Sequence, residues 1–164
     1  MQNSADVISV VIVEDDPVFR GSIVSLLNQC PTTICIGAYE GKESFLRIFD
    51  QTSPDIFWID INLKDGNGIE LIEFIQTQRQ DTLCLICTLH EDNDTVYEAL
   101  SKGADGYILK NASTDQMLEA LKELKAGGAP MSPFIARKVL TSFRQVSTKA
   151  EAESLVKTLS SRER

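Results

Sequence analysis

The sequence predicts an α/β fold: a doubly wound parallel sheet of five strands with helices on both faces. Short apolar runs of strand length alternate with segments of helical period, and this alternation occurs five times along the chain. The connections between these segments are short, which suits parallel strands joined by crossover helices. Because such crossovers are right-handed, the helices are expected to cover both faces of the sheet.

The N-terminal part is expected to contain two strands and two helices. Residues 7–13 are a continuous apolar run of strand length. Asp16-Pro17 then begins a helix, because aspartate is a good N-cap and proline fits the first helical turn. Residues 34–38 form a shorter strand. Apolar residues recur at helical spacing over residues 42–49, which predicts the second helix.

The central part repeats the pattern twice. Residues 55–60 are a third apolar run, and residues 68–79 carry isoleucine and leucine at helical spacing. Residues 82–88 form the fourth strand. A short helix over residues 95–102 ends before Gly103, because glycine favours a helix end.

The last unit begins with a strand over residues 106–109. Ser113 and Gln116 have the spacing of a capping box, which predicts the start of a helix. Gly127-Gly128 ends that helix. A further helix is expected over residues 134–143, where apolar residues again recur at helical spacing. The polar residues 144–153 are expected to be a linker or an exposed continuation of this helix.

The charge of the chain changes sign near its C-terminal end. The net charge is −8 in total, with −12 on residues 1–132 and +4 on residues 133–164. Such a change predicts a module boundary. An acidic body repels nucleic acid, so DNA contact is expected only from the C-terminal side or beyond it.

The sequence predicts a cytoplasmic protein without a membrane partner. No apolar run approaches the length of a transmembrane helix, and the N-terminus lacks a signal-peptide pattern. Of the four cysteines, Cys84 and Cys87 lie within an apolar strand, which predicts buried, inert thiols rather than a zinc or redox pair. Cys30 and Cys35 flank a turn and lack partners at ligand spacing.

Acidic residues follow two of the expected strands. Glu14 and Asp15 come directly after the first strand, and Asp60 ends the third and opens a polar loop that contains Asn62. In an open parallel sheet these strand ends meet at one edge. Carboxylates gathered there repel one another unless a cation lies among them. Mg²⁺ suits such a set, because it prefers carboxylate oxygens and keeps several waters.

Two further groups complete a predicted site at this edge. Thr88 follows the fourth strand and Lys110 follows the fifth. A carboxylate such as Asp60 can act as a nucleophile and form an aspartyl-phosphate. An ammonium group and a hydroxyl group beside it would stabilise the oxygens of the transferring phosphoryl group.

Four stretches of the chain together resemble the receiver domain of a bacterial two-component response regulator, over residues 6–128. They are Val11–Pro17, Pro54–Gly68, Thr88 and Gly103–Lys110. The resemblance implies a flavodoxin-like sheet with strand order 2-1-3-4-5.

The tail resembles another part of the same proteins. Residues 129–158 are similar to a linker, with a linker helix at about 133–144. Residues 159–164 resemble the opening of a LuxR-type helix-turn-helix DNA-binding domain. Ser160 and Glu163 have the spacing of a capping box there. We therefore interpret the chain as a fragment that ends where its output domain begins.

The resemblance implies a role for each residue of the predicted site. Asp60 would be the phosphoacceptor, and Glu14 and Asp15 would hold Mg²⁺ together with Asp60. Asn62 would add its main-chain carbonyl to the metal, and Lys110 would contact a phosphoryl oxygen. Thr88 and Tyr107 would be the paired switch residues, which respond to the phosphoryl group rather than receive it.

The resemblance also implies partners. A sensor histidine kinase would donate the phosphoryl group to Asp60. Phosphorylation would change homodimerisation or release the output domain, and DNA would be bound only through that missing domain. The protein would act as a transcriptional switch that can lose its own phosphoryl group, and not as a multiple-turnover enzyme.

Two residues depart from the commonest family pattern. Glu14 stands where aspartate is more usual, and Lys64 stands where proline is frequent, which is expected to loosen the loop after Asp60. His90, the single histidine, is expected to be a loop residue and not a phosphoryl carrier.

Three alternatives remain open. A receiver could act only through protein contacts, for example by sequestering a partner. An aspartyl-phosphate phosphatase would need an acid two residues after Asp60, where this chain has Asn62. A flavodoxin-like mononucleotide binder would need a Gly/Ser/Thr-rich loop after the first strand, where Glu14-Asp15-Asp16 would repel an anion.

Overall fold

The computed structural model describes residues 7–162 and contains a central sheet of five parallel strands. The sheet order is β2-β1-β3-β6-β7, which corresponds to 2-1-3-4-5 among the parallel strands. The predicted fold class is therefore confirmed. The strands are β1 (Ile8–Val13), β2 (Thr33–Tyr39), β3 (Ile56–Ile59), β6 (Leu83–Thr88) and β7 (Gly106–Leu109).

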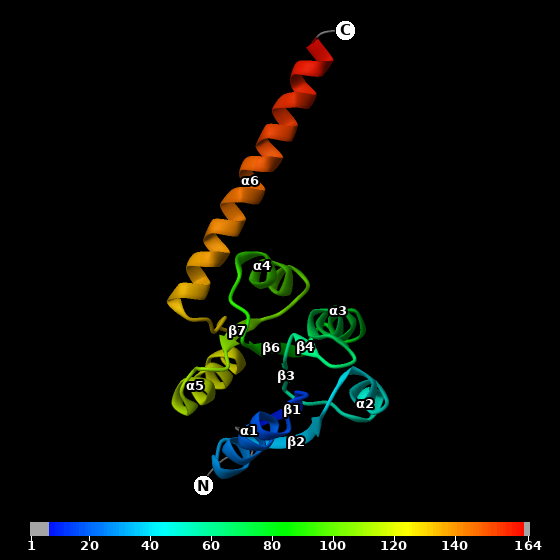
Figure 1. The fold of residues 1–164 in the computed structure, drawn as a ribbon, viewed down its shortest axis with the longest axis vertical. Coiled ribbons are helices and arrows are strands. Elements are labelled where there is room, and N and C mark those ends of the chain that lie inside the picture. Colours follow the sequence, from blue (N-terminus) through cyan, green and yellow to red (C-terminus); the bar gives the residue numbers. More distant parts are fainter. Residues whose placement is uncertain (1–6, 163–164) are drawn as a thin grey trace.

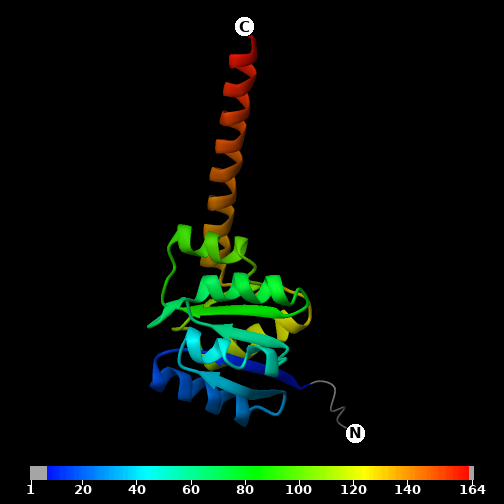
Figure 2. The same ribbon diagram turned by 90° about the vertical axis from the view of Figure 1, so that its right-hand side faces the viewer.

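Helices cover both faces of the sheet (Figures 1 and 2). One face carries α1 (Pro17–Gln29) and α5 (Thr114–Lys125), and the other carries α2 (Lys42–Leu46), α3 (Gly68–Gln78) and α4 (Asn93–Ser101). The capping predictions hold at two of these helices. Asp16 caps α1 by accepting from the main-chain N–H of Val18, and Ser113 and Gln116 form the capping box of α5.

Each face of the sheet buries its own apolar core. The α1 and α5 face packs around Trp58, and the opposite face packs around Phe45, Phe57 and Tyr107. Phe45 and Phe57 meet edge to face with ring centroids 5.5 Å apart. All four residues of β3 are buried, as expected for the central strand of a sheet covered on both sides.

Three elements differ from the expected ones. The helix expected over residues 42–49 ends at Leu46 and is followed by a separate 3₁₀ turn, η2 (Phe49–Gln51). The loop after Asp60 contains an unpredicted antiparallel hairpin of β4 (Asn62–Leu63) and β5 (Gly66–Asn67). Helix α4 begins earlier than expected, because Asp92 caps it by accepting from the N–H of Thr95 at 3.0 Å.

The C-terminal helix extends far beyond the residues 134–143 predicted for it. Helix α6 runs from Pro133 to Arg162, so residues 144–153 continue the helix rather than form a linker. Residues 144–153 contain no Gly or Pro and several good helix formers, so nothing in them ends the helix. Ser160 lies inside α6, so no new helix begins there, and Glu163 lies outside the described residues. The domain division at residues 128 and 158 stays a prediction.

The chain after α5 is attached to the edge of the sheet and to α4. The N–H of Tyr107 in β7 donates to the carbonyl of Pro130 at 2.9 Å, and Met131 forms a parallel bridge with Tyr107. Ile135 is fully buried in the same core as Tyr107, and the first turns of α6 pack on α4. The rest of α6 projects away from the body (Figures 1 and 2).

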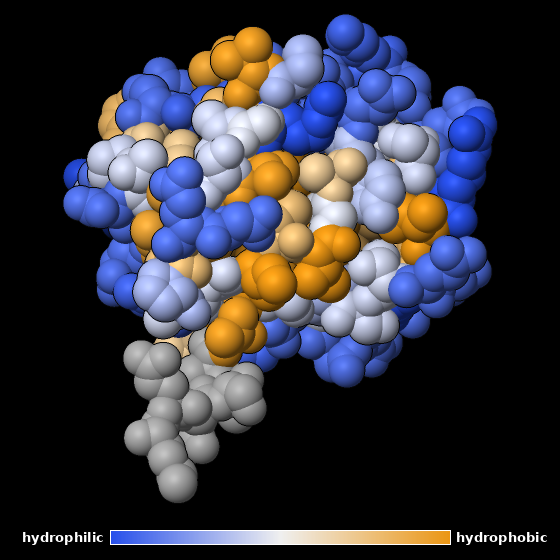
Figure 3. Space-filling model, turned by 90° about the horizontal axis from the view of Figure 1, so that it is seen from below, coloured by the Kyte–Doolittle hydropathy of each residue, from blue (hydrophilic) through white to orange (hydrophobic). Residues whose placement is uncertain are grey.

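The opposite edge of the sheet is formed by β2. Within residues 7–162, β2 pairs with β1 alone, and its Ile34 and Ile36 are 44% and 45% exposed. Viewed from this end, the surface shows apolar groups among polar ones (Figure 3). Among residues 7–162, no helix combines the length and the apolar character needed to cross a membrane.

Candidate functional site

Three carboxylates meet at the carboxyl-terminal edge of the parallel sheet. Glu14 and Asp15 follow β1, and Asp60 follows β3. Each offers an oxygen atom, and these atoms all lie within 4.8 Å of one another. The N–H of Asp60 donates to the carbonyl of Val13 at 3.0 Å, which aligns the ends of the two strands. The three acids expected at one edge are therefore brought together.

These residues fit a hard divalent cation. The side chain of Glu14 is 1% exposed, and that of Asp60 is 6% exposed. Oε2 of Glu14 is buried and has no hydrogen-bond partner among the described residues. A buried carboxylate oxygen without a partner is costly, and a metal ion would satisfy it. Oxygen donors of this kind are the ligands that Mg²⁺ prefers.

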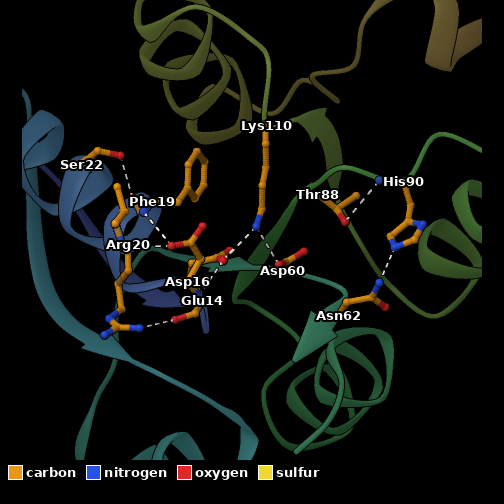
Figure 4. A network of polar contacts seen from close by, with 11 residues as sticks. Glu14, Asp16, Phe19, Arg20, Ser22, Asp60, Asn62, Thr88, His90 and Lys110 are labelled. Atoms are coloured by element: carbon orange, nitrogen blue, oxygen red, sulfur yellow. Dashed lines mark hydrogen bonds and ion pairs between the residues drawn. The ribbon is translucent and has the colours of Figure 1, made fainter. Parts of the chain in front are cut away.

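Lys110 reaches this cluster from the end of β7 (Figure 4). Its Nζ lies 2.8 Å from Oε1 of Glu14 and 2.9 Å from Oδ2 of Asp60. It also lies 4.9 Å from the centre of the Phe19 ring, which shields one side of the ion pair. The ammonium group therefore balances part of the negative charge that the sheet edge collects.

The surroundings shift the pKa values of both partners. Burial raises the pKa of Glu14 to about 7, with a further increase from the charge of Asp60, although the hydrogen bond from Lys110 acts in the opposite direction. Burial by itself would lower the pKa of Lys110, but its hydrogen bonds to Glu14 and Asp60 outweigh burial and leave that pKa raised.

Thr88 and Tyr107 are linked through the main chain of His90. Thr88 is buried at the end of β6, and its Oγ1 accepts from the N–H of His90 at 3.5 Å. The Tyr107 ring is fully buried, and its hydroxyl donates to the carbonyl of His90 at 2.6 Å. Burial raises the pKa of the Tyr107 hydroxyl above its usual range. The two expected switch residues thus both form hydrogen bonds with the main chain of His90, in the loop between β6 and α4.

Asn62 and His90 form a contact that sequence reasoning missed (Figure 4). The side-chain nitrogen of Asn62 is hydrogen-bonded to Nε2 of His90. Asn62 lies in β4, opposite Asn67. His90 lies in the loop between β6 and α4, as expected, and its side chain also contacts the hairpin that follows Asp60. Its position two residues after Thr88 was the available signal.

Two more residues contact Glu14: Arg20, which was not singled out from the sequence, and Asp16, which was predicted as the N-cap of the first helix. Arg20 of α1 donates from its guanidinium group to the carbonyl of Glu14 at 2.7 Å. The N–H of Asp16 donates to Oε1 of Glu14 at 3.1 Å. Both contacts fix the turn that follows β1, and so they hold Glu14 in its buried position.

The other groups considered in the sequence lie apart from this cluster or in its core. Cys84 and Cys87 are buried in β6, as the apolar run predicted, and burial raises the pKa of both thiols. Lys64 lies in the turn of the β4–β5 hairpin. The loop it was expected to loosen is instead a paired structure.

The chain matches a protein-family model over most of its length. The model described as the response regulator receiver domain matches residues 10–122. The transcriptional regulatory protein DegU of Brevibacillus brevis is 29% identical over 147 residues, which cover 90% of this chain and 62% of that protein. The nitrate/nitrite response regulator protein NarL of Escherichia coli K12 is 25% identical over 156 residues, covering 95% of this chain and 71% of NarL. The chain thus spans less than two thirds of the length of DegU.

Solved structures share the same fold. A LuxR-family two-component response regulator from Aurantimonas sp. SI85-9A1 superposes with a TM-score of 0.76 and 26% identity, over 82% of this chain and 96% of the other. The isolated receiver domain of RcsB from Salmonella enterica serovar Typhimurium, solved with phosphomimetic BeF₃⁻, gives a TM-score of 0.73 at 20% identity, over 81% of this chain and 99% of the other.

Proposed function

Because this chain belongs to the response regulator receiver domain family, we propose that it is the phosphorylation switch of a two-component transcriptional regulator. In this proposal Asp60 accepts a phosphoryl group from a sensor histidine kinase. The observation that carries the proposal is the meeting of Glu14, Asp15 and Asp60 with the ammonium group of Lys110 at one sheet edge. The reading as a transcriptional regulator is supported by relatives described as such, DegU among them.

The acceptor reaction uses Asp60 as a nucleophile. A carboxylate oxygen of Asp60 attacks phosphorus, so that a new O–P bond forms while the P–N bond to the kinase histidine breaks and its imidazole leaves. Mg²⁺ bound by Glu14, Asp15, Asp60 and the main-chain carbonyl of Asn62 would neutralise charge on the transferring group. Lys110 would contact a phosphoryl oxygen, and its distance of 2.9 Å from Asp60 supports this role.

The response to phosphorylation passes through the loop that His90 occupies. A phosphoryl group on Asp60 would attract the hydroxyl of Thr88, whose Oγ1 also accepts from the N–H of His90. The same loop holds Tyr107 through its hydroxyl and leads into α4. Phosphorylation would therefore change the relative populations of two arrangements of this loop and α4.

The proposed output runs through α6. Its first turns pack on α4, and its Ile135 shares a core with Tyr107. A shift of α4 would therefore move or release α6. We propose that this change alters homodimerisation or frees a DNA-binding output domain in the complete regulator, where DNA would be bound.

The test is intact mass after incubation with acetyl phosphate and Mg²⁺. We expect one added phosphoryl group on the wild-type chain and none on Asp60→Asn. The matched control is Asp55→Asn. Asp55 directly precedes β3, at the amino-terminal end of that strand and away from Asp60, and it pairs with Lys125 at 2.8 Å.

Each contrary result has a defined meaning. An adduct that persists in Asp60→Asn would reject Asp60 as the acceptor. A wild-type chain that takes up no phosphoryl group would favour the alternative in which the receiver acts only through protein contacts.

A further inference from the structure

The hairpin that follows Asp60 is tied at its tip to a separate helix. The carboxylate of Asp65, in the turn between β4 and β5, accepts from the main-chain N–H groups of Lys42 at 2.8 Å and Glu43 at 2.9 Å. These two N–H groups belong to the first turn of α2, whose donors have no partner within the helix. Asp65 therefore connects the turn of the hairpin to the start of a helix that lies more than twenty residues earlier in the sequence.

Helix α2 needs this carboxylate from outside. Its own N-cap is Gly41, which has no side chain to accept from the first turn. The absence of a side chain also makes room, because a Cβ on Gly41 would lie 2.6 Å from Oδ1 of Asp65. The hydrogen bonds from Glu43 and Lys42 lower the pKa of Asp65, so the carboxylate is charged at neutral pH and accepts from both donors.

The base of the hairpin is fixed separately. The N–H of Gly68 donates to the carbonyl of Ile61 at 2.7 Å, and Leu63 is buried in the core. The ion pair of Lys42 with Glu70, at 3.5 Å, is exposed and contributes little. Asp65 thus connects the exposed tip of the β4–β5 hairpin to α2, and the proposed acceptor Asp60 directly precedes the base of this hairpin.

The tied segment contains a proposed metal contact. Asn62 in β4 would offer its main-chain carbonyl to Mg²⁺, and its side chain contacts His90. Asp65 and the proposed metal ligand Asp15 line one polar groove of about 420 Å³. A change in how the hairpin lies against α2 would therefore alter the groove beside the metal ligands.

We propose that Asp65 is a positioning residue for the acceptor site. It holds the tip of the β4–β5 hairpin against α2 and, together with the contacts at the hairpin base, keeps Asn62 in place beside Asp60. This inference rests on the proposed function, since it concerns the same metal and phosphoryl site. Asp65 is not among the carboxylates that would hold the metal, which are Glu14, Asp15 and Asp60.

The experiment compares three variants of the full chain. Asp65→Ala removes both hydrogen bonds to α2, and Asp65→Asn keeps one acceptor oxygen. The matched control is Ser44→Ala, because the hydroxyl of Ser44 also holds the start of α2, through its hydrogen bonds with Gly41. A merely structural cap of α2 would be weakened by both alanine substitutions.

Three readouts are measured on each variant. Mg²⁺ affinity is followed by the fluorescence of Trp58, the single tryptophan, which lies two residues before Asp60. The rate of phosphorylation by acetyl phosphate is followed by intact mass. Hydrogen exchange over residues 61–68 reports whether the hairpin opens.

We expect Asp65→Ala to weaken Mg²⁺ binding by about tenfold, as is common when a residue that orients a metal ligand is lost. It should also slow phosphorylation and speed hydrogen exchange over residues 61–68. Asp65→Asn should recover most of the affinity, and Ser44→Ala should change it less than about twofold.

Two results would overturn the positioning role. One is a wild-type Mg²⁺ affinity and phosphorylation rate in Asp65→Ala together with lowered thermal stability. The other is an equal loss in Ser44→Ala. If the wild-type chain binds Mg²⁺ but takes up no phosphoryl group, the proposed function fails while the Mg²⁺ comparison still decides the role of Asp65. If it binds no Mg²⁺, both are rejected.

Discussion

At the scale of single residues, Glu14 differs from an ordinary surface carboxylate because it is buried beside a second acid. Lys110 contacts both Glu14 and Asp60, so one ammonium group is shared between two carboxylates. Burial raises the pKa of Glu14 to about 7 against a usual value of 4.5. A site built on this residue therefore depends on pH in the neutral range.

The first prediction concerns Mg²⁺ affinity and pH. Mg²⁺ binds the ionised carboxylate, so binding at low pH must first displace a proton from Glu14. With a pKa of about 7, we expect affinity to fall roughly tenfold between pH 8 and pH 6. The measurement is a Mg²⁺ titration followed by Trp58 fluorescence. In Glu14→Gln this step should be absent, and a pH-independent wild-type affinity would contradict the prediction.

The same shift sets the sign of one contribution to stability. The folded chain keeps the Glu14 proton up to about pH 7, whereas the unfolded chain loses it near 4.5. The folded state therefore binds more protons between these two values. The contribution of Glu14 to the free energy of unfolding decreases as pH rises through this range.

At the scale of elements, two glycines on different helices differ in how much space surrounds them. Gly68 begins α3, and a Cβ there would lie 1.9 Å from the main-chain carbonyl oxygen of Asp60. Gly21 lies in α1, and a Cβ there would meet nothing within 4 Å. The first glycine lets a helix approach the acceptor loop, and the second has no such role.

The second prediction follows from this pair. Gly68→Ala must displace the main chain at Asp60, so we expect loss of phosphorylation and a lower melting temperature. Gly21→Ala should raise the free energy of unfolding by about 0.5–1 kcal/mol, because alanine loses less backbone entropy in a helix. Urea unfolding and the acetyl phosphate assay measure both effects. Normal phosphorylation of Gly68→Ala would show that the loop tolerates the shift.

The third prediction tests the attachment of α6. Ile135 of α6 is fully buried in the core cluster that also contains Tyr107 and the α4 residue Val96. Ile135→Ala should therefore cost about 2–4 kcal/mol of stability locally and release the first turns of α6. Phe134, 57% exposed, is the control, and its alanine variant should change stability by less than about 0.5 kcal/mol. Hydrogen exchange in α6 and α4 is the measurement. Unchanged protection in Ile135→Ala would mean that the helix is held elsewhere.

The sequence predicted the elements whose signals are local. Apolar runs predicted the five parallel strands. The charged residues directly after them, such as Asp60 and Lys110, predicted most of the candidate site. The contact of Asn62 with His90 joins positions 28 residues apart, and that of Asp65 with Glu43 joins positions 22 apart. Such contacts depend on the path of two loops, which no local pattern specifies.

At the scale of the whole molecule, charge separates the two parts of the chain. Residues 1–132 carry a net −12, and residues 133–164 carry a net +4. The basic residues of the second part lie mostly along α6, on one helix that projects from an acidic body (Figure 2). A few basic groups on a single helix support weak, salt-sensitive contact with phosphates but no reading of base sequence.

The fourth prediction is that this chain does not bind DNA sequence-specifically. In a gel shift, we expect any retarded band to disappear between about 50 and 200 mM salt and to be competed equally by unrelated DNA. A complex that survives this salt and prefers one sequence would contradict the prediction. Phosphorylation with acetyl phosphate should leave the result unchanged.

The length of α6 has a mechanical consequence. Its 30 residues span about 45 Å at 1.5 Å per residue, and only the first turns rest on α4. The helix is therefore held at its first turns, and the much longer remainder moves with them. A tilt of only about 10° at α4 would carry the far end through about 8 Å, given that length. A small displacement of α4 after phosphorylation of Asp60 would thus become a large change in the position of the far end of α6.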